Sequence, residues 1–239
     1  YVDLDKRITV LPYGQRFGIA AKNFYRLISD INFCNYDYIA LSDQDDIWDV
    51  NKLSHAVHIL NINRADIYSS DVIAFWDDNK KKLIKKSYKQ KKFDHFFESP
   101  GAGCTFLARS ANMQTFQGFI LNNWEEVSKI ESHDWLMYAF YRERDIKWII
   151  DDKPLMLYRQ HGLNQVGANI GFKEYVKRIK SIRNGLYRAE IYKIFTLVAC
   201  KNKFLFDLDW LFLLKNVYQL RRRNRDVLLI LVVIIFRIF

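Results

Sequence analysis

The sequence predicts an α/β fold with a mixed, mainly parallel sheet flanked by helices, followed by basic and apolar helices at the C-terminal end. Short runs of β-branched and aromatic residues alternate with stretches in which apolar residues recur at helical spacing. Half of the 239 residues are hydrophobic, which is enough for a packed core in a chain of this length. Only nine glycines and three prolines are present, which excludes collagen-like and linker-dominated architectures.

The first part of the chain alternates between expected strands and expected helices. β-branched runs predict the strands, and apolar residues three or four positions apart predict the helices. In order, the expected elements are a strand at Ile8–Leu11, a helix over about Gly18–Ile31, a strand at Tyr36–Leu41, a helix capped by Asp49 and a strand at Ile67–Trp76. A turn at Asp77–Asn79 then leads into a lysine-rich stretch, expected to be a returning arm or an exposed loop.

The second part begins with a loop of small residues at Ser99–Thr105 and continues with a helix that starts near Ser132. Lys147–Ile150 and Leu155–Tyr158 are expected to form a short strand pair. Beyond Gly171 the pattern becomes helical and basic. We therefore expect one domain over residues 1–171 and a helical, membrane-associated extension over residues 172–239.

Charge and cysteine content narrow the class of protein. The chain carries 37 Lys and Arg against 27 Asp and Glu, and this excess of +10 attracts an anionic partner. Cys34, Cys104 and Cys200 are widely spaced, so the sequence indicates neither a zinc ribbon nor a disulfide framework, and a reducing compartment is the simpler expectation. No apolar run reaches the roughly 18 residues that a transmembrane helix requires.

Asp43, Asp45 and Asp46 lie within four residues at the end of an expected buried strand. Carboxylates this close repel one another by about 1 kcal/mol or more per pair in a partly buried site. A hard divalent cation such as Mg²⁺ or Mn²⁺ removes that repulsion. The alternative is a solvated acidic turn that caps the next helix, but Trp48 offers an apolar face for a sugar or a base and favours the ligand site.

The run Asp-Gln-Asp-Asp-Ile-Trp at residues 43–48 resembles the metal-binding turn of family 2 glycosyltransferases of the rhamnosyltransferase-like kind. Further motifs follow in the family's order, and the resemblance covers about Arg7–Gly171. It implies a GT-A nucleotide-sugar domain with Mn²⁺ or Mg²⁺ as cofactor. It also implies inverting transfer of a sugar, rhamnose being one candidate, from a nucleotide-diphosphate donor to a hydroxyl of a surface polysaccharide or a lipid-linked glycan.

The resemblance also assigns roles to residues. At the metal, Asp45 is the implied direct ligand, Asp43 contacts the metal or the donor ribose, Asp46 supports these two ligands, and His161 is a further ligand. Lys22, Asn23 and Trp48 are the implied donor-binding residues, and Arg159 contacts the departing diphosphate. Gly103, Cys104 and Thr105 lie on the acceptor side, and Asp134 is the implied catalytic base. Inverting transfer needs one carboxylate that takes the proton of the acceptor hydroxyl. A structural explanation without a functional role stays open for each motif. Lys22 and Asn23 would lie in an ordinary amphipathic helix, and Gly103 in a simple turn. Asp134 would neutralise a helix start, and His161 would be a chance histidine in a surface loop.

The N-terminus departs from the family's pattern. That pattern begins with a strand, a helix and an aspartate-rich turn that grips the nucleotide base, and nothing before Tyr1 supplies them. We therefore expect an N-terminally incomplete fragment or a degenerate copy. The second hypothesis for function is accordingly a non-catalytic, membrane-associated remnant of the fold that binds anionic lipid.

Two basic segments bear on partners. No ladder of aromatic residues interleaves the lysines between Lys80 and Lys92, since Tyr88 and Phe93 are the only rings close by, so no nucleic-acid partner is expected. The arginine-rich run at residues 221–225 precedes ten consecutive apolar residues, Val227–Phe236, which are too few to span a bilayer alone. We expect peripheral membrane contact through residues 221–239, with the protein in the cytoplasm at the inner face of the cell membrane. A helix packed on the core is the alternative.

Overall fold

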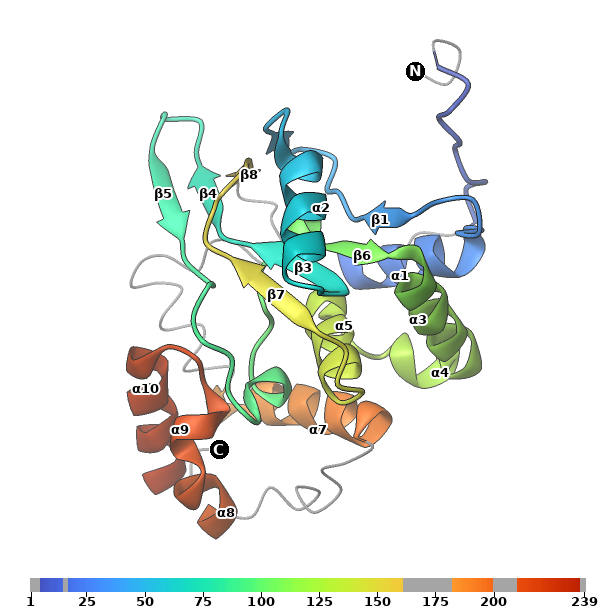
Figure 1. The fold of residues 1–239 in the computed structure, drawn as a ribbon. Coiled ribbons are helices and arrows are strands. Elements are labelled where there is room, and N and C mark those ends of the chain that lie inside the picture. The colour runs from blue at the N-terminus through green and yellow to red at the C-terminus, as the bar shows by residue number, and fades with distance from the viewer. Residues whose placement is uncertain (1–4, 15–16, 161–181, 200–209, 237–239) are drawn as a thin grey trace.

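Two four-stranded sheets form the centre of the fold (Figure 1). The computed structural model describes residues 5–14, 17–160, 182–199 and 210–236. One sheet has the strand order β1-β6-β3-β7 and the other the order β2-β8-β4-β5. The strands are β1 (Tyr38–Ala40), β2 (Ile47–Trp48), β3 (Ile67–Ser70), β4 (Val72–Phe75), β5 (Lys81–Ile84), β6 (Leu107–Arg109), β7 (Trp148–Asp151) and β8 (Met156–Arg159).

The mixed α/β class is confirmed. Among the described strands, however, two of the six pairings are parallel, β3 with β7 and β4 with β8. Antiparallel pairings are thus the majority, contrary to the expected balance. The expected strand at Ile8–Leu11 is wrong, since these residues join neither sheet.

The helices pack mainly on the β1-β6-β3-β7 sheet and on one another (Figure 1). They are α1 (Ala20–Asp30), α2 (Lys52–Ile62), α3 (Ser110–Asn122), α4 (Trp124–Val127), α5 (His133–Arg142), α7 (Leu186–Val198), α8 (Trp210–Lys215), α9 (Val217–Leu220) and α10 (Asn224–Ile235), with short 3₁₀ helices η1 (Asp94–Phe96) and η2 (Gly103–Thr105). The helices expected near Gly18 and Ser132 are confirmed as α1 and α5. Asp49 does not cap α2, because its carboxylate accepts a hydrogen bond from the backbone N–H of Asn51 at 2.8 Å, ahead of the helix.

The long strand expected at Ile67–Trp76 is divided at Asp71 between the two sheets. The buried carboxylate of Asp71 accepts hydrogen bonds from the backbone N–H groups of Lys86 at 2.5 Å and Ser87 at 2.8 Å. The chain after β5 is thereby fastened at the division. β7 and β8 follow the same course beside β3 and β4, so the expectation that they pair with each other is wrong.

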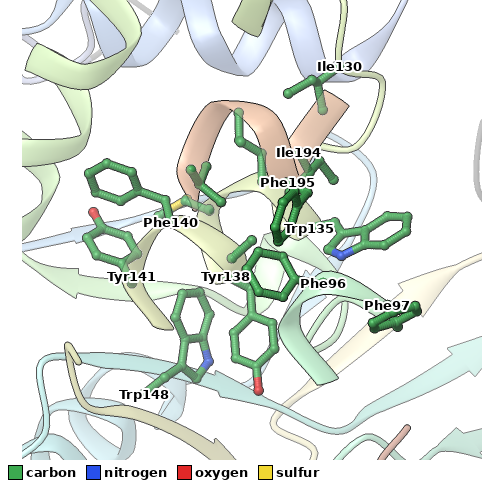
Figure 2. Close-up of a cluster of buried hydrophobic side chains, with 14 of the residues drawn as sticks. Phe96, Phe97, Ile130, Trp135, Tyr138, Phe140, Tyr141, Trp148, Ile194 and Phe195 are labelled. Carbon is green, nitrogen blue, oxygen red and sulfur yellow. The ribbon is translucent and has the colours of Figure 1, made fainter. Parts of the chain in front are cut away.

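The largest hydrophobic cluster surrounds α5, whose residues from Trp135 to Tyr141 are all buried. Figure 2 shows their rings packed with aromatic side chains from η1, β7 and α7. Tyr138 meets Trp148 edge-to-face with the ring centroids 5.2 Å apart. Burial of each large apolar side chain stabilises the fold by about 1.5–3 kcal/mol, so α5 and the residues at its start are firmly positioned.

The C-terminal helices belong to the same cluster, because apolar residues of α7 to α10 pack into it. Arg222 lies between α9 and α10 with its side chain 1% exposed, and its guanidinium contacts the carboxylate of Asp94 at 3.0 Å. Its backbone N–H also donates to the carboxylate of Glu98 at 2.6 Å. Arg222 is therefore built into the core, and the expectation that the whole arginine run faces lipid is wrong for this residue.

The expected domain boundary between residues 171 and 172 lies outside the described residues and stays a prediction. No helix in the described part of the chain combines the length and the hydrophobicity that a bilayer crossing requires.

Replacing Arg222 by Met is expected to lower the free energy of unfolding by about 3 kcal/mol or more, because it removes a cation from buried Asp94 and Glu98. Urea denaturation measures the change. Arg225→Met is the matched control, since the Arg225 side chain is 67% exposed, and it is expected to change stability by no more than about 0.5 kcal/mol. Equal effects of the two substitutions would show that the Arg222 ion pairs do not hold the helices in place.

Candidate active site

The acidic turn connects β1 with β2 and lies against the loop that contains Cys104. The backbone N–H of Leu41, at the start of the turn, donates to the carbonyl of Phe106 at 3.1 Å. One ligand atom each from Asp43, Asp46 and Cys104 lies within 4.8 Å of the other two. Two carboxylates and a thiol from separate segments thus converge beyond the end of β1.

The end of β8 holds the acidic turn in place. The backbone N–H of Arg159 donates to one carboxylate oxygen of Asp46 at 3.0 Å, and its guanidinium donates to the backbone carbonyl of Asp45 at 3.0 Å. The other carboxylate oxygen of Asp46 is buried and has no hydrogen-bond partner among the described residues. A buried oxygen without a partner is costly, which marks this position as a place for a cation or a donor group.

The electrostatics of the cluster favour a positive ligand. Burial, reinforced by the charges of the neighbouring carboxylates, raises the pKa of Asp43 and of Asp46. Burial also raises the pKa of the Cys104 thiol well above its usual value, and the two carboxylates add to that shift. These shifts mean that the site resists accumulating negative charge on its own, and a divalent cation relieves that resistance.

Lys52 is a buried cation beside the cluster to which the sequence analysis gave no role. Its residue is 4% exposed, and its ammonium lies 3.5 Å from the ring centroid of Trp48. Burial lowers the pKa of Lys52 to about 8, while the neighbouring Cys104 and Asp46 oppose the shift. One face of the Trp48 ring is therefore covered by Lys52, and only its remaining surface is open to a ligand. The sequence feature that could have predicted this contact is the four-residue spacing of Trp48 and Lys52.

Gly103 allows the start of α5 to approach the Cys104 loop. A Cβ atom on Gly103 would lie 2.3 Å from Nε2 of His133, so any larger residue has to displace the imidazole. On its other side the His133 ring stacks on Phe24 of α1, with the ring centroids 4.2 Å apart. The loop, α1 and α5 therefore meet at His133, next to the expected base Asp134.

Tyr158 in β8 packs against the small cluster that contains Cys104. Burial, followed by the neighbouring Cys104, raises the pKa of its hydroxyl, and the charges of Asp43, Asp46 and Asp134 contribute to the same shift. Asp134 itself lies in the first turn of α5, where its carboxylate accepts the backbone N–H of Trp135 at 2.9 Å. Asp134 thus follows His133, which contacts Gly103 next to Cys104 of the acidic cluster.

The remaining expected residues are placed less closely. Lys22 is half-buried and Asn23 is exposed in the first turn of α1, beside Phe24. The hydroxyl of Thr105 donates to the carbonyl of Ala102 at 2.7 Å within its own loop. Asp45 is not among the residues whose ligand atoms converge, and His161 lies outside the described residues. The roles of these residues stay predictions.

With this geometry established, the comparisons with known proteins identify the family. No family model matches the chain. The dTDP-rhamnosyl transferase RfbG of Shigella flexneri is 44% identical over 238 residues, which cover 97% of this chain and 82% of RfbG. The chain belongs to the rhamnosyltransferase-like glycosyltransferases. The solved structure of S. aureus TarS 1–349 in complex with UDP-GlcNAc is weakly similar to this chain, with 11% sequence identity and a TM-score of 0.41. The similar region covers 84% of this chain and 60% of the TarS chain.

Replacing Lys52 by Met is expected to raise the free energy of unfolding by about 1–3 kcal/mol at pH 7, because the fold no longer buries an ammonium. The pKa of Lys52 is about 8 in the fold and 10.5 in the unfolded chain, so the native state binds fewer protons between those values and wild-type stability rises there. The advantage of Lys52→Met should therefore shrink as the pH rises from about 8 to about 10.5.

Urea denaturation of both proteins at pH 7 and pH 10 measures this difference. Lys82→Met is the control, because Lys82 is exposed in β5 and its replacement is expected to have a small effect at both pH values. An advantage of Lys52→Met that is the same at both pH values would contradict the burial of a titrating lysine beneath Trp48.

Proposed function

We propose that this glycosyltransferase moves a rhamnosyl group from dTDP-rhamnose to a hydroxyl of a surface polysaccharide or a lipid-linked glycan, with inversion at the anomeric carbon. The observation that carries the proposal is the convergence of Asp43, Asp46 and Cys104, beside the loop that His133, the neighbour of Asp134, contacts. The choice of donor is supported by the 44% identical relative, which is named a dTDP-rhamnosyl transferase.

The donor set of the site fits a divalent cation. Two carboxylates converge there, and one buried oxygen of Asp46 lacks a hydrogen-bond partner among the described residues. Asp43 and Asp46 would hold Mn²⁺ or Mg²⁺, and the family resemblance adds Asp45 and His161 as further ligands. Bound there, the cation supplies positive charge that neutralises the diphosphate of the donor and of the product.

The chain's own residues supply the remaining chemistry. Asp134 takes the proton from the acceptor hydroxyl as that oxygen attacks the anomeric carbon, so no covalent sugar–enzyme species is required. The burial of α5 fixes the Asp134 backbone, which keeps the base in one place during the reaction. Arg159 fixes the acidic turn through two hydrogen bonds, and Lys52 adds positive charge close to Asp46.

Replacing Asp134 by Asn is expected to lower the turnover of dTDP-rhamnose by about 100-fold or more, because a positioned general base contributes about that much to the rate. Release of dTDP through slow transfer to water is a suitable readout, since it needs no identified acceptor. Calorimetry with dTDP and Mn²⁺ should show unchanged binding by this variant.

Asp43→Asn is the informative comparison, because it is expected to weaken Mn²⁺-dependent dTDP binding by at least about tenfold. Turnover that survives in Asp134→Asn would remove the base role. If the wild-type chain binds anionic lipid but shows neither turnover nor Mn²⁺-dependent dTDP binding, the alternative of a non-catalytic remnant would replace this proposal.

We also propose that α10 contacts an anionic membrane, with the protein in the cytoplasm at the inner face of the cell membrane. Val227, Ile230 and Ile234 pack into the core, while the opposite side of the helix leaves apolar residues exposed. These are Leu228 at 60%, Val232 at 49%, Ile235 at 52% and Phe236 at 70% exposure. The exposed Arg225 at the start of the helix complements anionic headgroups, which supports lipid as the ligand of this face.

The double substitution Leu228→Asp/Val232→Asp is expected to reduce flotation with vesicles containing phosphatidylglycerol by about tenfold or more, because two apolar contacts with lipid are replaced by charges. Ile62→Asp is the matched control, since Ile62 is 61% exposed on α2, away from α10. Vesicles of phosphatidylcholine alone should bind the wild-type chain more weakly. Flotation that is equal in the double variant and the control would refute contact through α10.

A further inference from the structure

Cys104 occupies an unusual environment for a buried cysteine. A buried free thiol normally packs as a small apolar group. Cys104 is 1% exposed, yet its sulfur lies in the same 4.8 Å cluster as carboxylate oxygens of Asp43 and Asp46. Cys104 therefore contributes to the polar site as well as to packing.

Two further observations indicate that this cluster is prepared for a ligand. One carboxylate oxygen of Asp46 is buried without a hydrogen-bond partner among the described residues. Nε2 of His133 is also buried without such a partner, and it presses against Gly103, immediately before Cys104. The close approach at Gly103 restrains the loop, and with it the position of the sulfur beside the acidic turn.

We propose that Cys104 is a ligand of the cation, completing a two-carboxylate, one-thiolate donor set with Asp43 and Asp46. On binding, the S–H bond breaks, a metal–sulfur bond forms and the proton passes to solvent. This inference rests on the proposed function for its cation requirement, and it goes further by assigning the sulfur ligand and the kind of metal that the site selects.

The sulfur determines which cation is preferred. Mg²⁺ is a hard ion that takes oxygen ligands, whereas thiolates favour softer ions such as Zn²⁺, Co²⁺ and Cd²⁺. Mn²⁺, like Mg²⁺, is suited to carboxylate ligands. The thiolate therefore shifts the preference of the site towards softer ions, and Cys104 acts at the metal rather than in the acceptor contact that the family resemblance implied.

A cobalt titration of the full chain tests the sulfur ligand without an activity assay. Cys34 is exposed and Cys200 lies outside the described residues, so both are replaced by Ser to leave Cys104 as the single thiol. Co²⁺ is expected to produce a near-ultraviolet thiolate-to-cobalt charge-transfer band that saturates at one ion per chain. Adding Cys104→Ser should abolish the band and weaken Cd²⁺ binding by at least about tenfold.

The outcomes separate this inference from the proposed function. Co²⁺ binding without a charge-transfer band, or a band that survives Cys104→Ser, overturns the ligand role of Cys104. If Mn²⁺-dependent dTDP binding persists in that case, the proposed function stands. If the wild-type chain binds no divalent cation, both the sulfur ligand and the metal-dependent function fail. The spectrum of the chain with Cys104 intact decides the matter even if the Ser variant does not fold.

Discussion

The repulsion between Asp43 and Asp46, held close together and partly out of water, is the interaction to which the rest of the site responds. Neighbouring groups offset it incompletely. Arg159 donates its backbone N–H to Asp46, and Lys52 contributes a positive charge that burial itself weakens. The cluster thus retains a need for positive charge, which is the physical basis for the proposed binding of a cation and a diphosphate there.

The framework brings the parts of this site together from distant segments. The division of a long strand at Asp71 sends β4 into the second sheet, and β8 follows it in parallel and carries Tyr158 and Arg159 to the acidic turn. The aromatic packing of α5 against η1, β7 and α7 positions Asp134. Because β8 holds the acidic turn and α5 carries Asp134, the position of Asp134 relative to the turn depends on the core that both elements share.

Features set by neighbouring residues were predictable from the sequence, and those set by distant ones were not. The spacing of apolar residues located α1, and the strand before Asp43 placed the acidic turn at a strand end. In contrast, the division at Asp71 depends on Lys86 and Ser87, 15 and 16 positions away, and no local pattern reports such a partner. The burial of Lys52 and the membership of Cys104 in the acidic cluster likewise follow from how separate segments pack.

The arginine run shows how burial divides one charge pattern into different roles. Arg222 contacts Asp94, 128 positions earlier, and Asp94 also accepts the hydroxyl of Tyr138 in α5. The C-terminal helices are therefore joined to the element that carries Asp134. Since the inward side of α10 is already packed, lipid contact would use its outward apolar residues without detaching the helix. Membrane binding and an intact active site are thus physically compatible, because lipid contact would leave the packed side of α10 in the core.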